Sequence, residues 1–173
     1  MTVTLVLGGA RSGKSNFAER LIAESTATRR IYLATATAGD TEMAERIAHH
    51  RARRPAVWQT IEAPLALGET VAHNAAADSA LLVDCLTLWL SNLMHAGREV
   101  DDETARLVAV LRQAPGDIVL VSNEVGLGLV PETSLGRAFR DAQGRLNQAV
   151  AEVAVRVAFI AAGLPLWLKG GVM

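Results

Sequence analysis

The sequence predicts an α/β fold of three layers, in which a mostly parallel central sheet has one antiparallel strand at its edge. Two observations point to this class. Short β-branched and leucine-rich runs alternate with alanine-rich helical stretches, and such alternation is typical of right-handed βαβ units. The last two apolar runs meet around Gly163-Leu164-Pro165, which favours a closing hairpin and therefore an antiparallel edge.

The expected elements follow from hydrophobic periodicity and from helix-capping residues. Apolar runs predict strands at residues 3–7, 31–34, 57–62, 81–85, 118–122, 155–161 and 164–168. Helices are expected at residues 14–24, from Asp40 or Thr41 to near 53, at 66–76, after 85 through 93, at 101–113, and from Ser134 to near 152. Residues 123–131 form a glycine-rich loop. Because ligands of such sheets bind at the carboxyl ends of the strands, functional side chains are expected there.

Length, charge and composition exclude several classes of protein. The 173 residues suit one domain, and half of them are hydrophobic, which excludes a disordered chain. Because 17 basic and 18 acidic residues nearly cancel, no nucleic acid or anionic membrane is expected as a partner. The single Cys85 excludes an intrachain disulfide and a cysteine zinc cluster. An uncharged start and charge-broken apolar stretches predict a cytoplasmic protein with no signal peptide and no membrane span.

A phosphate loop at residues 8–15 is the strongest motif. Gly8-Gly9-Ala10-Arg11-Ser12-Gly13-Lys14-Ser15 fits G-x-x-x-x-G-K-[ST] and stands between a strand and a helix, which predicts a P-loop NTPase-like fold. Backbone N–H groups and the helix N-terminus would surround phosphate oxygens, with Lys14 at the β- and γ-phosphates and Ser15 on Mg²⁺. The alternative is a glycine-rich turn with an incidental lysine, although Lys14 is one of only two lysines. Arg11 either touches phosphate or is solvated.

A carboxylate is expected where the apolar run at residues 81–83 ends. Asp84 follows this run, as the Mg²⁺-side acid does in proteins with a phosphate loop. Together with the loop, Asp84 makes a nucleoside triphosphate and Mg²⁺ the expected ligands. The alternative is an aspartate that caps the next helix. The chain has no Asn-Lys-x-Asp string, so a switch GTPase is not expected.

Two adjacent histidines stand among arginines after the second expected strand. In a helix over residues 40–53, His50 lies with Met43 and Ile47 on the apolar face, whereas His49 lies on the polar face. His50 is therefore expected to be a packed side chain. Two interpretations of His49 stay open, a solvated surface histidine or a nucleophile that attacks a nucleotide α-phosphate.

These motifs resemble those of the bifunctional adenosylcobinamide kinase / adenosylcobinamide-phosphate guanylyltransferase family of cobalamin biosynthesis. The resemblance covers nearly the whole chain. It is carried by the phosphate loop, His49-His50, Asp84-Cys85, the string Asn-Glu-Val-Gly-Leu-Gly-Leu-Val-Pro-Glu at residues 123–132, Phe139-Arg140-Asp141, Gly144-Arg145 and Asn147-Gln148. Many folds share the phosphate loop, but the string at residues 123–132 is far more specific.

The resemblance implies two reactions on a corrinoid substrate. Adenosylcobinamide is phosphorylated with ATP or GTP. GMP is then transferred from GTP to adenosylcobinamide-phosphate through a guanylyl-histidine, which yields adenosylcobinamide-GDP and pyrophosphate. The histidine that carries GMP corresponds to His49. The resemblance also implies a homotrimer.

The resemblance further implies which residues contact nucleotide. Besides residues 8–15, these are Thr35, Ala36, Thr37, Arg51, Ala52, Arg53, Arg54, Glu62 and Asp84. Lys14 and His49 are the expected catalytic residues, and Ser15 and Asp84 are the expected Mg²⁺ ligands. Some relatives have Glu in place of Asp84, and either carboxylate can bind Mg²⁺. The role of Glu124 is not assigned.

Overall fold

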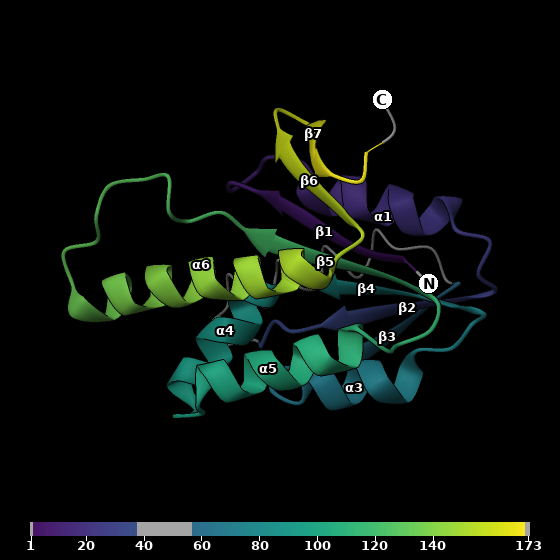
Figure 1. The fold of residues 1–173 in the computed structure, drawn as a ribbon, viewed down its shortest axis with the longest axis horizontal. Helices are drawn as coiled ribbons and strands as arrows, with labels where there is room; N and C mark the ends of the chain where they lie inside the picture. The colour runs from purple at the N-terminus through teal and green to yellow at the C-terminus, as the bar shows by residue number, and fades with distance from the viewer. Residues whose placement is uncertain (1, 38–56, 172–173) are drawn as a thin grey trace.

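The computed structural model describes residues 2–37 and 57–171. Within them the chain forms a seven-stranded sheet (Figure 1). Its strands are β1 (Thr2–Gly8), β2 (Arg29–Ala34), β3 (Trp58–Glu62), β4 (Ser79–Asp84), β5 (Asp117–Asn123), β6 (Arg156–Ala161) and β7 (Leu164–Lys169). The helices are α1 (Lys14–Glu24), α3 (Leu67–Asn74), α4 (Leu86–His95), α5 (Val100–Leu111) and α6 (Ser134–Val153).

The strand order across the sheet is β3-β2-β4-β5-β1-β6-β7. All neighbouring strands are parallel except β6 and β7, which confirms the expected antiparallel edge. The order places β5 between β1, which leads into the phosphate loop, and β4, which ends at Asp84. The ends of these three strands therefore lie side by side at the carboxyl edge of the sheet.

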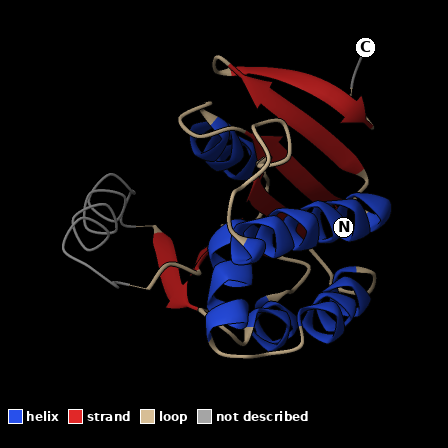
Figure 2. Ribbon diagram, turned by 90° about the vertical axis from the view of Figure 1, so that its left-hand side faces the viewer, coloured by secondary structure: helices blue, strands red, loops and turns tan. Residues whose placement is uncertain are grey.

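Helices cover both faces of the sheet and give three layers (Figure 2). Alternate side chains of each strand point to opposite faces, so Leu5 and Leu7 of β1 join one core and Val6 joins the other. The larger core contains residues of α3, α4, α5 and α6. The smaller core is covered by α1, through residues such as Phe17 and Ile22. Burial of these apolar faces stabilises the layered arrangement.

The closing hairpin contacts the phosphate loop. Ala162 and Gly163 between β6 and β7 both have positive φ, at 51° and 79°, as a two-residue type I′ turn requires. The Gly163 N–H donates to the Ser12 carbonyl at 2.8 Å. A Cβ at Gly13 would lie 3.1 Å from the Gly163 Cα, so the two segments approach each other closely. The hairpin thus supports the loop from the side.

Two helices extend the carboxyl edge of the sheet. The Asn92 side chain of α4 donates to the Thr35 carbonyl at 2.7 Å and to the Pro64 carbonyl at 3.0 Å. Thr35 directly follows β2, and Pro64 lies two residues after β3. Helix α6 is bonded to the end of β5 only from Gln143 onward, so its first turns project beyond the edge. The region between α4 and α6 therefore lies on the same side as the phosphate loop.

The bounds differ from the expected ones at several points. Cys85 is not the last strand residue but the N-cap position of α4, because β4 already ends at Asp84. Helix α6 begins at Ser134 as expected, and its cap is the neighbouring Thr133, whose hydroxyl accepts the Gly136 N–H at 3.1 Å. The helix expected over residues 40–53 lies outside the described residues.

Candidate active site

The phosphate loop connects β1 to α1 in a tightly curved path. Gly13 is the N-cap of α1 with φ 95°, a conformation that glycine adopts without strain. A Cβ at Gly8 would lie 2.6 Å from the Ser12 Oγ and 2.7 Å from the Ile160 carbonyl, so the site requires glycine. The N-terminus of α1 thereby faces the inside of the loop, where its N–H groups can bind phosphate.

Ser12 contributes a buried hydroxyl that can still form hydrogen bonds with a ligand. Its Oγ is buried and, within residues 2–37 and 57–171, has no hydrogen-bond partner. A buried hydroxyl without a partner costs free energy, which a bound polar ligand would recover. An oxygen-rich ligand inside the loop satisfies this requirement.

Lys14 is the cation of the site. Its Nζ donates to the Gly9 carbonyl at 3.0 Å, across the loop. Burial lowers the pKa of Lys14, while the charges of Cys85 and Asp84 act in the opposite direction. In the sheet only β5 separates β4 from β1, so Asp84 and the phosphate loop follow strand ends at the same edge.

Thr35 fixes the backbone next to Asp84. Its buried hydroxyl donates to the Cys85 carbonyl at 2.7 Å and accepts the Cys85 N–H at 2.8 Å. The Thr35 N–H also donates to the Asp84 carbonyl at 3.4 Å. The Asp84–Cys85 peptide bond is cis. The resemblance implied that Thr35 contacts nucleotide, but its side chain here holds the end of β4. Ala36 and the exposed Thr37 follow it at the same edge.

The end of β5 lies between the loop and α4. The Glu124 N–H donates to the Gly8 carbonyl at 3.1 Å, and the Asn123 N–H donates to the Thr87 hydroxyl at 2.8 Å. The Glu124 Oε1 accepts the Gly126 N–H at 2.6 Å, so this carboxylate stabilises the turn that follows it. This contact gives Glu124 a structural role that the sequence pattern did not reveal.

Glu62 is farther from the loop than Asp84. Both residues flank Ala34, Glu62 from β3 and Asp84 from β4. Two strand spacings of about 4.8 Å therefore separate their backbones. Glu62 is exposed at the edge. The other implied nucleotide contacts, Arg51, Ala52, Arg53 and Arg54, lie outside the described residues, as do His49 and His50.

Ser15 and Asp84 suit a magnesium ion. In the described part of the chain, no three His, Cys, Asp or Glu side chains gather into a cluster that could hold a metal. Mg²⁺ does not need such a cluster, because it commonly binds one or two protein oxygens together with substrate phosphates and water. The hydroxyl at the start of α1 and the carboxylate at the end of β4 are of this kind.

Asn92 and Asn147 are site-supporting residues that sequence reasoning gave no role. Asn92 ties α4 to the segments after β2 and β3, and Asn147 donates to the Asn123 carbonyl at 3.2 Å. A polar residue on the inward side of an expected helix is the signal that could have identified both; Asn147 is buried and Asn92 half-buried. Its partner, however, follows only from the tertiary structure.

A family model and curated relatives match this chain over nearly its whole length. The model described as "Cobinamide kinase / cobinamide phosphate guanyltransferase" (CobU) matches residues 4–168. The chain belongs to this family. The bifunctional adenosylcobalamin biosynthesis protein CobP of Pseudomonas aeruginosa is 56% identical over 168 residues, which are 96% of each chain. CobU of Salmonella typhimurium is 41% identical over 180 residues, which cover 95% of this chain and 98% of that protein.

Solved structures of other proteins share the fold of this CobU-family chain. An ATPase from the type III secretion system of pathogenic bacteria superposes with a TM-score of 0.60 at 13% identity. That match covers 96% of this chain but 56% of the ATPase, so the chain spans little more than half of its length. The flagellar accessory protein FlaH of Methanocaldococcus jannaschii superposes with a TM-score of 0.54 at 14% identity, over 99% of this chain and 81% of FlaH. At these identities the likeness concerns the fold alone.

Of the helices in the described ranges, none combines the length and the apolar character that crossing a bilayer requires.

Proposed function

We propose that this chain phosphorylates adenosylcobinamide and then converts the phosphate to adenosylcobinamide-GDP. The observation that carries the proposal is the phosphate loop, in which Lys14 lies partly buried near Asp84, in a chain of the CobU family. In this proposal residues 1–173 form one nucleotide-binding domain that performs both reactions in the cytoplasm, with ATP or GTP as donor in the first and GTP in the second.

The first reaction needs charge neutralisation more than covalent help. The hydroxyl oxygen of adenosylcobinamide bonds to the γ-phosphorus, the bond to the nucleoside diphosphate breaks, and the hydroxyl proton passes to solvent. Lys14 exchanges the Gly9 carbonyl for the β- and γ-phosphates, and the Ser12 hydroxyl and loop N–H groups bind the remaining oxygens. Ser15 and Asp84 hold Mg²⁺, which supplies further neutralisation of the phosphate charge.

The second reaction uses a histidine nucleophile. A ring nitrogen of His49 bonds to the α-phosphorus of GTP, and pyrophosphate leaves. A phosphate oxygen of adenosylcobinamide-phosphate then bonds to the same phosphorus and releases the imidazole. Two displacements are favourable because a neutral imidazole approaches a polyanion more readily than a second phosphate does. Arg51, Ala52, Arg53, Arg54 and Glu62 belong to the nucleotide-contacting set in this proposal.

A homotrimer is part of the same proposal. Leu164, Leu166 and Leu168 alternate along β7 and remain exposed on the edge strand, where association would cover them. Sedimentation equilibrium of the purified chain measures the mass directly. A mass of three chains supports the trimer, whereas a monomer or dimer contradicts it.

Product analysis tests the function. The protein is incubated with adenosylcobinamide, GTP and Mg²⁺, and the corrinoid products are separated and weighed by mass spectrometry. We expect adenosylcobinamide-phosphate followed by adenosylcobinamide-GDP. Nucleotide binding without either product would contradict the proposal, and accumulation of the phosphate alone would reduce it to a kinase.

Substitution of the histidines tests the second step. His49→Ala should abolish retention of label from α-³²P-GTP on the denatured protein, while phosphorylation of adenosylcobinamide continues, because transfer to a hydroxyl needs no imidazole. His50→Ala should retain label and lower the free energy of unfolding by about 1–3 kcal/mol, as loss of a packed side chain does. Label that survives in His49→Ala but not in a stably folded His50→Ala would assign the nucleophile to the second ring.

A further inference from the structure

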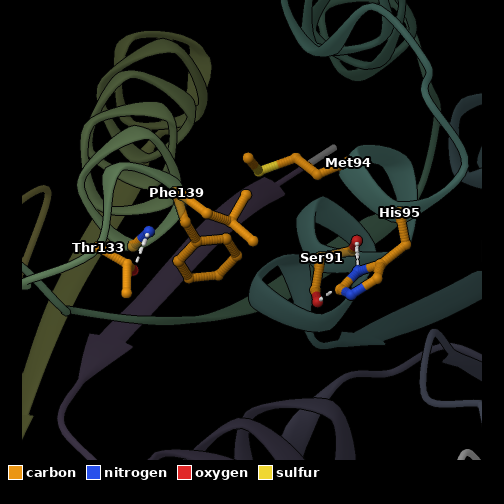
Figure 3. A pocket seen from close by; sticks show the side chains of 7 residues that line it. Ser91, Met94, His95, Thr133 and Phe139 are labelled. Carbon is orange, nitrogen blue, oxygen red and sulfur yellow. Dashed lines mark hydrogen bonds between the residues drawn. The ribbon is translucent and has the colours of Figure 1, made fainter.

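An apolar pocket lies between α4 and the projecting start of α6, with a volume of about 450 Å³. Met94, Leu135 and Phe139 supply most of its surface, and Ser91, His95 and Thr133 lie at its polar positions. Figure 3 shows Met94 and Phe139 reaching into the space from the two helices, while His95 turns back to Ser91. The His95 Nδ1 lies 2.7 Å from the Ser91 carbonyl and donates to it, because a carbonyl only accepts.

On both α4 and α6, the pocket residues lie about one helical turn from a residue that is hydrogen-bonded to the end of β5. On α4, the Thr87 hydroxyl accepts the Asn123 N–H, and Ser91 follows four residues later. On α6, Gln143 donates to the Ser122 hydroxyl at 3.0 Å, and Phe139 precedes it by four residues. Four helical residues span about 6 Å along the axis. The pocket is therefore next to the strand end whose Glu124 N–H is bonded to Gly8 of the phosphate loop.

The lining indicates a largely apolar ligand that carries no anionic group. Apart from the imidazole of His95, no lining side chain is ionisable, so the pocket lacks the cations that a phosphate or carboxylate would require. Leu135 is 63% exposed at its rim. Leu127, Leu129 and Val130 in the loop before α6 are exposed as well. An apolar pocket beside a catalytic site is typical of substrate recognition.

We propose that this pocket receives the corrin ring of the corrinoid substrate, an inference that rests on the function proposed above. A corrin has a methyl-rich macrocycle and carboxamide side chains without charge. The methyl groups would pack on Met94, Leu135 and Phe139, and carboxamides would bond to Ser91 and His95. The ring would then lie beside the strand ends while its aminopropanol arm extends to the phosphate loop. The volume encloses only part of such a ligand, so the exposed loop leucines would cover more of it.

Steady-state kinetics of Leu135→Asp test this assignment. Leu135 is largely exposed, so the variant should fold, and a carboxylate at the rim opposes binding of an apolar ring. We expect the KM for adenosylcobinamide to rise roughly tenfold, which is about the effect of losing the burial of one apolar side chain. The KM for nucleotide should not change. Val155→Asp is the matched control. Val155 is 53% exposed and directly precedes β6, at the amino ends of the strands, so this variant should leave both KM values unaltered.

A second variant and a direct binding measurement complete the test. Phe139→Ala enlarges the pocket and should likewise weaken equilibrium binding of adenosylcobinamide to the nucleotide-free protein, provided its thermal unfolding stays cooperative. Unchanged corrinoid binding in both variants would overturn the pocket assignment while turnover persists. Absence of any corrinoid turnover in the unmodified protein would instead overturn the proposed function. A changed sedimentation mass for Leu135→Asp would mean that a second copy, not the substrate, occupies this surface.

Discussion

Lys14 has opposing influences on its charge. Burial in the loop lowers its pKa, whereas the acidic neighbours Cys85 and Asp84 act in the opposite direction. Its Nζ donates to the Gly9 carbonyl, a neutral acceptor. A nucleotide polyphosphate would replace this acceptor with a full negative charge and would raise the pKa of the lysine again. The sequence pattern predicted the position of Lys14, but not that the side chain rests against its own loop.

Lys14→Ala should remove the kinase reaction. The substitution deletes the charge that stabilises the transferring phosphate, and loss of such a group commonly costs about a hundredfold or more in kcat. Initial rates of adenosylcobinamide phosphorylation measure the effect. Lys169→Ala is the control, since Lys169 is exposed on β7. A near-normal rate in Lys14→Ala would sink the phosphate-loop assignment.

Cys85 should be unreactive in the folded protein. Burial and the charge of Asp84 raise the pKa of its thiol from 9.0 to about 11. At pH 8 the thiolate, which is the reactive form, is therefore about a hundredfold scarcer than in the unfolded chain. Folded protein should react slowly with a thiol reagent such as Ellman's reagent, and urea-unfolded protein rapidly. Equal rates would contradict the burial of this residue.

The raised pKa of the Cys85 thiol also makes the stability of the folded state depend on pH. Between pH 9.0 and about 11 the thiol ionises in the unfolded chain but not in the folded one. The unfolded state therefore loses a proton that the folded state retains, and stability through this group falls as the pH rises.

At the scale of elements, α6 is joined to β5 by a buried polar network. The Ser122 hydroxyl donates to the Asn147 Oδ1 at 2.7 Å, and Gln143 donates to both residues at 3.0 Å. Helical periodicity predicted α6 correctly because its apolar residues follow a regular spacing. It gave no reason for Gln143 and Asn147 on the buried face, since their partners are more than 20 residues away in the sequence.

Asn147→Ala should destabilise the fold through this network. It removes the acceptor of the Ser122 O–H and the side-chain donor to the Asn123 carbonyl, and the loss of such buried partners costs about 1–3 kcal/mol. Urea denaturation measures the change in the free energy of unfolding. Gln148→Ala on the exposed face of the same helix should change stability by less than about 0.5 kcal/mol. Equal effects of the two substitutions would show that the network adds no stability.

At the scale of the whole molecule, the sequence predicted which strands exist but not their order. Periodicity is a local property, whereas the insertion of β5 between β1 and β4 depends on long-range packing. The expected convergence of motifs at the strand ends is nevertheless found for the phosphate loop and Asp84. The loop after β5 joins the same edge because its Glu124 N–H pairs with Gly8, a contact that no sequence pattern indicates.

Mg²⁺ and nucleotide together should stabilise the whole molecule. A ligand that binds only the folded state at about 100 times its Kd adds about 2.7 kcal/mol. Thermal unfolding with GTP should therefore occur at a higher Tm when Mg²⁺ is present than when it is chelated. Asp84→Asn should lose most of this Mg²⁺-dependent increment, because it removes one negative charge beside the ion. If Asp84→Asn keeps the full Mg²⁺-dependent increase in Tm, Asp84 does not contribute to Mg²⁺ binding.

Because the chain has few lysines, chemical modification of Lys14 can measure whether a ligand occupies the phosphate loop. The chain has two lysines, and Lys169 is bonded to the carbonyls of Ala151 and Glu152 at the end of α6. Acylating reagents attack the neutral amine, which the lowered pKa of Lys14 makes more abundant. Peptide mapping after brief acylation would therefore give occupancy of the loop from a single modified site. A bound polyphosphate protects that site, while Lys169 in the same digest serves as the internal reference.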